Sequence, residues 1–171
     1  MLEYVTDALV LSKEPYKDFD ARYVFFTRRF GKISGKATSV RKITSKLAGH
    51  LEPGTLAQVR FVEKNHGNGT QIVDALGTGR LYAALPNLGR LAAILAEGDA
   101  DEALWSALTE GRFSWREILR IQGWDPEGAV CAQCGREAAA AFLIPRQDFL
   151  CDACASKIRP DALILLTNGT V

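Results

Sequence analysis

Residues 22–40 read RYVFFTRRFGKISGKATSV, and this stretch decides the fold of the first half of the chain. Its first part, Arg22–Arg28, is rich in aromatic and β-branched residues, which favour a pleated strand. Gly31 interrupts the run, and residues 32–40 then alternate between small or apolar and polar side chains, the period of a strand with one buried face. We therefore expect two strands joined by a tight turn at Phe30–Lys32.

Three further segments on either side of this pair have the same strand-like composition: Val5–Lys13, Thr55–Glu63 and Thr70–Leu76. The polar, basic residues 41–53 between them indicate a loop with room for a helical turn, and Asn65–Gly69 is a strong turn signal. Five short strands in about 75 residues predict a Greek-key barrel of the OB type. We assign it to residues 1–78.

The period of the apolar residues changes to that of helices after Gly77. Leucines recur at helical spacing up to Leu95, and Pro86 breaks or starts a helix within that run. Asp99 is positioned to cap a second helix, and Ser114 begins a third that stops at Gly123. The predicted fold class is thus α+β: the barrel, then a small helical domain over residues 79–171 with a zinc finger embedded at 129–156.

The cysteines of the chain form two close pairs, separated by sixteen residues. This spacing is typical of a zinc site in which four thiolates surround one metal and leave no position open for water, so the metal is structural. Disulfides or metal-free buried cysteines are the alternatives. Phe142 and Phe149 lie between the pairs and either cover the sulfurs or pack in the ordinary core. The predicted ligands are Cys131, Cys134, Cys151 and Cys154.

Charge is distributed unevenly, although the net charge is only +1. Residues 21–50 hold eight cations and no acid, whereas residues 97–127 hold eight acids and three arginines. A basic, strand-rich segment of this kind is typical of a surface that binds polyanions without reading sequence. The interleaved aromatic residues could stack on bases, or they could fill the barrel; they are Tyr23, Phe25, Phe26 and Phe30.

Enzyme signatures are missing from the sequence, which contains no phosphate-binding GxxxxGK[ST] loop, no HExxH and no GxSxG. The two histidines, His50 and His66, lie in expected loops and read as surface residues. Residues 1–12 lack the features of a signal peptide, and no apolar run is long enough to span a membrane. We expect a protein without catalytic residues in the cytoplasm, associated with the nucleoid if it binds DNA.

Several motifs in this order resemble the RecO family of bacterial recombination mediators. Tyr16–Asp20 and Phe26–Ile33 look like the strand–turn–strand signature of that family. Ser45–Pro53, with its SKL start and later L-x-P, is similar to another family segment. Leu119–Gly123 followed by the two cysteine pairs looks like the family's approach to its zinc finger.

The resemblance implies a DNA repair protein that binds single- and double-stranded DNA, anneals complementary strands and helps to load the recombinase RecA. Its implied partners are RecR and the acidic tail of single-stranded-DNA-binding protein, and its implied metal is structural Zn²⁺. The cations expected to bind DNA are Arg28, Arg29, Lys32, Lys36, Arg41, Lys42 and Lys46.

One difference from the family is the short helical part, with about 50 residues between barrel and finger, so we expect a reduced pocket for the partner's tail. Arg116 and Arg120, with Arg112 before them, are the candidates for an anion-receiving face, and a solvated face is the other explanation. Two other functions fit the sequence: an RNA-binding protein of translation or transcription, and a scaffold whose barrel binds an acidic protein.

Overall fold

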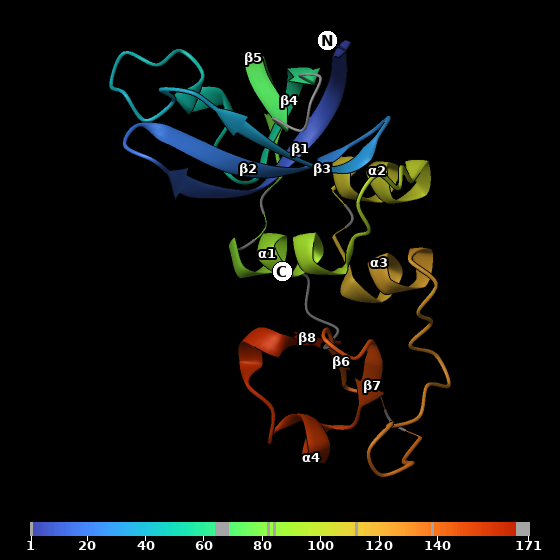
Figure 1. Ribbon diagram of the computed structural model, residues 1–171. Coiled ribbons are helices and arrows are strands. Elements are labelled where there is room, and N and C mark those ends of the chain that lie inside the picture. Colours follow the sequence, from blue (N-terminus) through green and yellow to red (C-terminus); the bar gives the residue numbers. More distant parts are fainter. Residues whose placement is uncertain are drawn as a thin grey trace. The chain divides into compact units, whose positions relative to one another are not determined.

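The computed structural model describes residues 2–63, 69–81, 83, 85–111, 113–137 and 139–166. Most of the turn predicted at Asn65–Gly69, His66 included, falls outside these residues. The chain divides into two compact units, Met1–Trp105 and Ser106–Val171, and we describe each unit by itself. Figure 1 gives the order of the elements along the chain.

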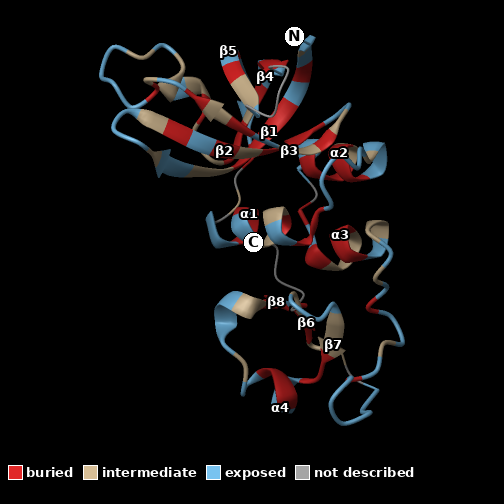
Figure 2. Ribbon diagram, in the orientation of Figure 1, coloured by how far each residue is buried: buried red, intermediate tan, exposed pale blue. Residues whose placement is uncertain are grey.

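The first unit is built on five strands at the predicted places. Side chains alternate along a strand, so one set of residues from each strand points into the barrel, while four consecutive residues of β1, Ala8–Leu11, are buried on both faces. In Figure 2 buried residues recur along these strands, while the long segment after β3 is mostly exposed or half-buried. The strands are β1 (Leu2–Tyr16), β2 (Asp20–Thr27), β3 (Gly31–Ala37), β4 (Thr55–Glu63) and β5 (Thr70–Arg80).

The strands close into a barrel in the order β1-β2-β3-β5-β4, and β4 returns to pair with β1. All pairs are antiparallel except β3 with β5, which pair in parallel over two positions, Gly35 with Thr70 and Lys36 with Gln71. A register shift between Val10 and Ser12 lets the long strand β1 bend and pair with both β2 and β4. The prediction of a five-stranded barrel of OB type, followed by helices, is confirmed.

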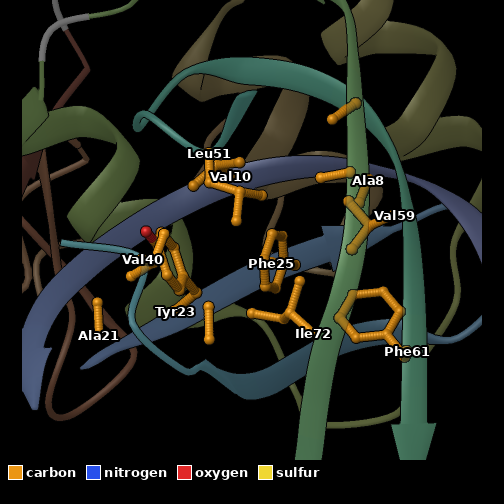
Figure 3. Close-up of a cluster of buried hydrophobic side chains, with 13 residues drawn as sticks. Ala8, Val10, Ala21, Tyr23, Phe25, Val40, Leu51, Val59, Phe61 and Ile72 are labelled. Atoms are coloured by element: carbon orange, nitrogen blue, oxygen red, sulfur yellow. The ribbon is translucent and has the colours of Figure 1, made fainter. Parts of the chain in front are cut away.

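Aromatic and aliphatic side chains from every strand fill the barrel. Tyr23 and Phe25 of β2 stack with ring centroids 5.8 Å apart, and Phe61 of β4 meets Phe25 edge to face at 5.3 Å. Figure 3 shows these side chains pointing toward one another with Val10 and Ile72. The hydroxyl of Tyr23 is buried without a hydrogen-bond partner in the described part of the chain, and burial raises its pKa to about 12.

The segment between β3 and β4 contains a single 3-10 turn, η1 (Ala48–His50), as the loop prediction allows. After the barrel, α1 (Leu85–Ile94) begins one residue before Pro86 and packs against β1 and β2 through Leu88 and Leu91, both fully buried. Proline is tolerated there because the first turn of a helix has no partner for its N–H. The leucine periodicity therefore predicted this helix correctly, and Pro86 starts it.

The residues after α1 return to the turn between β2 and β3. The Gly98 N–H donates to the Lys32 carbonyl at 3.0 Å, and Lys32 and Glu97 form a parallel β-bridge. Gly31 has φ +64°, and a Cβ added there would lie 2.2 Å from the Asp99 carbonyl oxygen. Only glycine fits this turn, both because of its left-handed backbone and because another backbone passes over it.

The helix α2 (Glu102–Thr109) begins two residues later than a cap at Asp99 would give. The Leu104 N–H donates to the Asp101 side chain at 2.9 Å, so Asp101 supplies the cap that the sequence suggested for Asp99. Asp99 is instead part of the backbone that covers Gly31. The prediction of the helix is right, and the residue named as its cap is wrong.

The second unit contains α3 (Trp115–Ile121) and a small sheet of order β7-β6-β8. Ser114 precedes α3 as predicted, but its side chain makes no capping hydrogen bond; Gly123, at φ +89°, follows its end. The cysteines lie close to this sheet: Cys131 and Cys134 in a turn before it, and Cys151 and Cys154 at the start of the helix that follows β7. The strands of the sheet and the short helices around it are β6 (Ala141–Leu143), β7 (Asp148–Leu150), α4 (Asp152–Ala155), η2 (Pro160–Ala162) and β8 (Leu163–Leu165).

Candidate metal centre and nucleic-acid interface

The four predicted cysteine ligands come together in the second unit, and their sulfur atoms all lie within 4.8 Å of one another. Cys134 Sγ and Cys151 Sγ are 3.6 Å apart. Sulfur atoms on a tetrahedron with Zn–S bonds of about 2.3 Å are separated by about 3.8 Å, whereas a disulfide needs about 2.05 Å. The arrangement therefore fits a metal site and not a pair of disulfides.

Two local structures bring these sulfur atoms together. After Cys131 the chain makes a tight turn in which the Gly135 N–H donates to the Cys131 carbonyl at 2.8 Å, with Gly135 at φ +73°. Cys151 is the residue before α4, and Cys154 lies in that helix with its N–H bonded to the Cys151 carbonyl at 3.1 Å. Each CxxC thus forms one compact turn, which lets both of its sulfurs reach the same metal.

The electrostatics of the cluster suit a cation. Hydrogen bonds from the backbone at Cys151 are the main reason that the pKa of Cys131 falls to about 6, while burial raises the pKa of Cys154 to about 12. Four neighbouring thiols cannot all ionise without a compensating charge, and a divalent metal supplies that charge. The donor set fits Zn²⁺, which would hold the two turns together and leave no ligand position for substrate.

The residues that cover the cluster differ from those expected. Ala141, Leu150 and Leu163, on one face of the small sheet, pack against the buried cysteines. Phe142 and Phe149 contact each other at 5.3 Å, and Phe142 also meets Trp124 at 5.0 Å. Phe142 follows Ala141 directly in β6 and so points to the other face, because neighbouring residues of a strand alternate. The interpretation as ordinary core packing is the correct one for this aromatic pair.

The seven cations expected to bind DNA lie near both ends of the β2–β3 hairpin, and those at the β2–β3 turn are partly neutralised. The Arg28 guanidinium contacts both carboxylate oxygens of Glu102, at 2.6 to 3.1 Å, which raises the pKa of Arg28. The side chain of Lys32 is 15% exposed, and its ammonium group donates to the Ala92 carbonyl at 3.1 Å and lies 3.5 Å from Glu97. Both cations already have an anionic partner, which weakens the prediction that they bind phosphates.

At the other end of the hairpin, the loop after β3 folds against the β1–β2 turn. The Ser39 N–H donates to Asp20 Oδ1 at 2.8 Å, and the Arg41 N–H donates to the Phe19 carbonyl at 2.9 Å. The Lys42 ammonium then lies 5.5 Å from the centre of the Phe19 ring. These bonds explain how residues about twenty positions apart form one exposed cationic surface.

The outer face of the hairpin continues this surface. Arg22 and Lys36 are cross-strand partners, and the Arg22 guanidinium lies 5.0 Å from the centre of the Tyr16 ring. Together with Ser34 and Thr70 these residues line a hollow of about 260 Å³. Among the residues that the structure describes, none that lines the hollow is acidic, although Glu14 is the partner of Arg22 on the β1 side. In the part of the chain that is described, none of Arg29, Lys36, Lys42 and Lys46 takes part in an ion pair.

We name the exposed surface at the β1–β2 end the cationic surface; its residues are Tyr16, Lys17, Asp18, Phe19, Arg22, Lys36, Arg41 and Lys42, and the exposed Lys46 follows in the same loop.

The aromatic residues that are exposed for base stacking differ from those expected from the sequence. Tyr23, Phe25 and Phe26 are fully buried, the first two inside the barrel and Phe26 outside it against Trp105, so they cannot stack on bases. Phe19 is 52% exposed on the cationic surface. Sequence analysis missed Phe19, Tyr16 and Arg22 as binding candidates. The signal was available, because an aromatic residue in a turn between strands has little core to enter.

The arginines proposed for an anion-receiving face have partners within the second unit. Arg116 Nε donates to the Leu166 carbonyl at 3.2 Å, and Arg120 contacts Glu127 at 2.9 Å and Asp125 at 3.6 Å. Arg112 lies outside the described residues. The explanation as an internally paired, solvated face fits Arg116 and Arg120 better than an anion site.

Among the described residues, no helix is both long and apolar enough to cross a membrane.

Comparison with known proteins gives consistent results. A family model described as "Recombination protein O N terminal" matches residues 1–76. The chain is 36% identical over 63 residues to a DNA repair protein RecO of Thermodesulfovibrio yellowstonii, which covers 37% of this chain and 25% of that protein. It is 35% identical over 99 residues to the RecO of Myxococcus xanthus, covering 56% and 38%. It is 27% identical over 181 residues to that of Koribacter versatilis, covering 90% and 72%.

Proposed function

The chain belongs to the RecO family, and from this premise we propose that it is a non-enzymatic mediator of DNA repair and recombination. Its barrel, residues 1–78, binds single- and double-stranded DNA and favours the pairing of complementary strands. The matched part of the chain spans 25% and 38% of the lengths of the first two relatives, and the proposed activity rests on the surface of this chain.

The observation that carries the proposal is the cationic surface. Arg41 and Lys42 are brought to the β1–β2 turn by backbone hydrogen bonds, beside exposed Phe19 and the cross-strand pair of Arg22 and Lys36. Cations without a fixed acid attract phosphates in a salt-dependent, sequence-independent manner, and exposed aromatic rings stack on bases. In OB-folds the face of strands 2 and 3 and the loop between strands 1 and 2 are the usual place for a strand of nucleic acid.

Residues 79–171 form, in this proposal, a helical domain whose finger at 129–156 is held by structural Zn²⁺ on the four cysteines. The metal fixes two turns and takes no part in chemistry. RecR and the acidic tail of single-stranded-DNA-binding protein are the proposed protein partners, and loading of RecA on coated DNA is the proposed outcome. The protein acts in the cytoplasm, at the nucleoid.

Charge reversal tests the DNA-binding role. Replacing Arg41, Lys42 and Lys46 by Glu should weaken binding to a single strand by more than tenfold at about 50 mM salt, since three phosphate contacts are lost. The slope of log affinity against log salt should fall by about 2. The matched control reverses three exposed arginines of the second unit and gives the same change in net charge; they are Arg136, Arg146 and Arg159.

Equal losses in the two triple variants would mean that net charge, and not this surface, determines binding. The other two candidate functions give different results in the same assays. Stronger retention of RNA than of DNA of equal length would favour a protein of translation or transcription. No retention of either nucleic acid at about 50 mM salt would favour a protein-binding scaffold. Strand annealing with and without single-stranded-DNA-binding protein then separates DNA contact from partner recognition.

A further inference from the structure

A second, larger cavity lies in the first unit beside the hollow of the cationic surface. It has a volume of about 800 Å³, within the range of small-molecule sites in proteins. Tyr4 and Phe30 line it together with the apolar side chain of Ile33. Ser34 and Thr70 line both this cavity and the hollow, so the two spaces adjoin along β3 and the start of β5.

The wall of this cavity is aromatic. The rings of Tyr4 and Phe30 are 4.6 Å apart at an interplanar angle of 53°, and Tyr4 also stacks on Phe61 at 5.5 Å. Tyr4 and Phe30 are only half-buried, although both stand at the edge of the barrel core. The Arg29 guanidinium lies 5.4 Å from the centre of the Phe30 ring. Such a wall is suited to stacking against a flat, unsaturated ring.

The hollow and the cavity are lined by different charges, which indicate different ligands for each. The hollow is lined by Arg22 and Lys36 without an acid, which suits a phosphate. The cavity is lined by two cations and two carboxylates, and its Lys32 is already next to Glu97, so it offers no net attraction to a phosphate. The other carboxylate, Glu63, accepts a hydrogen bond from the Tyr4 hydroxyl at 3.1 Å. Carboxylates at such a wall accept hydrogen bonds from the amino groups of bases.

We infer that the cavity receives one unstacked base of the single strand whose phosphate lies on Arg22 and Lys36. The inference rests on the proposed DNA-binding function and deepens it. Lys36 and Ser34 lie two residues apart on the outer face of β3, about 7 Å along the strand. A nucleotide therefore reaches from the hollow into the cavity past Ser34 and Thr70. A duplex, whose bases stay stacked, cannot use the cavity.

The experiment compares an ordinary single strand with a strand of equal length that carries abasic sites. Phe30→Leu removes the aromatic face and keeps an apolar side chain. It should weaken binding of the ordinary strand by about 5- to 150-fold, the usual effect of one lost base stack. Affinity for the abasic strand should stay the same. Equal loss with both strands would mean that Phe30 serves only the structure of the barrel and would overturn the inference.

A second variant keeps the test decisive if Phe30→Leu does not fold. Glu63→Gln preserves the shape of the side chain and replaces one acceptor oxygen by a donor. It should weaken binding of oligo(dC), whose exocyclic amino group donates, more than that of oligo(dT). An identical effect on both homopolymers contradicts the base assignment. If the unaltered protein binds no single strand at all, the proposed function itself fails, and the two failures are thereby distinguished.

Discussion

Among the glycines of the barrel that the structure describes, Gly31 should be the one at which an added methyl group is most damaging. An alanine Cβ at this position would lie 2.2, 2.3 and 2.5 Å from the O, C and N atoms of Asp99, where carbon contacts normally lie near 3.5–4.0 Å. The φ of +64° adds a cost of about 1–2 kcal/mol for any residue with a Cβ. Residues 97–99 would have to withdraw, which breaks the hydrogen bond from the Gly98 N–H to the Lys32 carbonyl.

The loss of stability expected for Gly31→Ala is the sum of three costs. Forced overpacking costs about 1–3 kcal/mol, and one lost backbone hydrogen bond costs about 1 kcal/mol. With the backbone strain, we expect Gly31→Ala to lower the free energy of unfolding by about 3–6 kcal/mol. Gly98→Ala is the matched control, because Gly98 also has a positive φ, +72°, but an added Cβ would meet nothing within 4 Å. It should cost only about 1–2 kcal/mol.

Urea titration followed by far-ultraviolet circular dichroism measures both values by linear extrapolation. The comparison depends on the difference between the two variants and so is insensitive to the reference state of the unfolded chain. Equal losses for Gly31→Ala and Gly98→Ala would refute the packing of residues 97–99 over the β2–β3 turn. The assignment of acidic partners to Arg28 and Lys32 would then lose its support.

Other variants test separate parts of the structure. Tyr23→Phe should raise the free energy of unfolding by about 1 kcal/mol, because it removes a buried hydroxyl with no partner among the described residues; a loss of stability would reveal a partner. Since burial raises the pKa of Tyr23 to about 12 from about 10, Tyr23 leaves stability independent of pH below about 10, and the fold loses stability as pH rises from about 10 toward 12, where this tyrosine ionises first in the unfolded chain. The unaltered chain should bind one zinc ion in metal analysis, and Cys134→Ser should abolish this binding. An unchanged zinc content would show that Cys134 is not a zinc ligand. Zinc affinity should fall with falling pH, because the thiol of Cys154, whose pKa burial raises, must lose its proton. Arg28→Gln should leave the urea midpoint nearly unchanged, because the ion pair with Glu102 is solvent-exposed; a large shift would show that the pair holds residues 97–102 in place.

The barrel could be predicted from the sequence because its signals are local. Two-residue alternation marks each strand, and Gly31 marks the turn. The order of the strands around the barrel depends on contacts between distant residues; from the sequence, the count and spacing of the strands predicted only the type of barrel. The clustering of the four cysteines could be predicted from their spacing, since two CxxC pairs at this separation fit few other structures.

The cationic surface was predicted only in part. Net charge along the sequence does not reveal which cations have partners, and the acids that meet Arg28 and Lys32 come from a segment about 65 to 75 residues later. The aromatic residues of β2 were ambiguous for a related reason. Alternation places Phe26 outside the barrel, and only the packing of Trp105 over it shows that it is buried.

The measurement that tests the central claim most directly is the salt dependence of single-strand binding for two neutralising double variants. The first replaces Arg22 and Lys36 by Gln, and the second replaces Arg28 and Lys32 by Gln. If the strand lies on the cationic surface, the first variant lowers the slope of log affinity against log salt by about 1.4, and the second leaves it nearly unchanged. A larger change in the second variant, or the same change in both, would contradict the account.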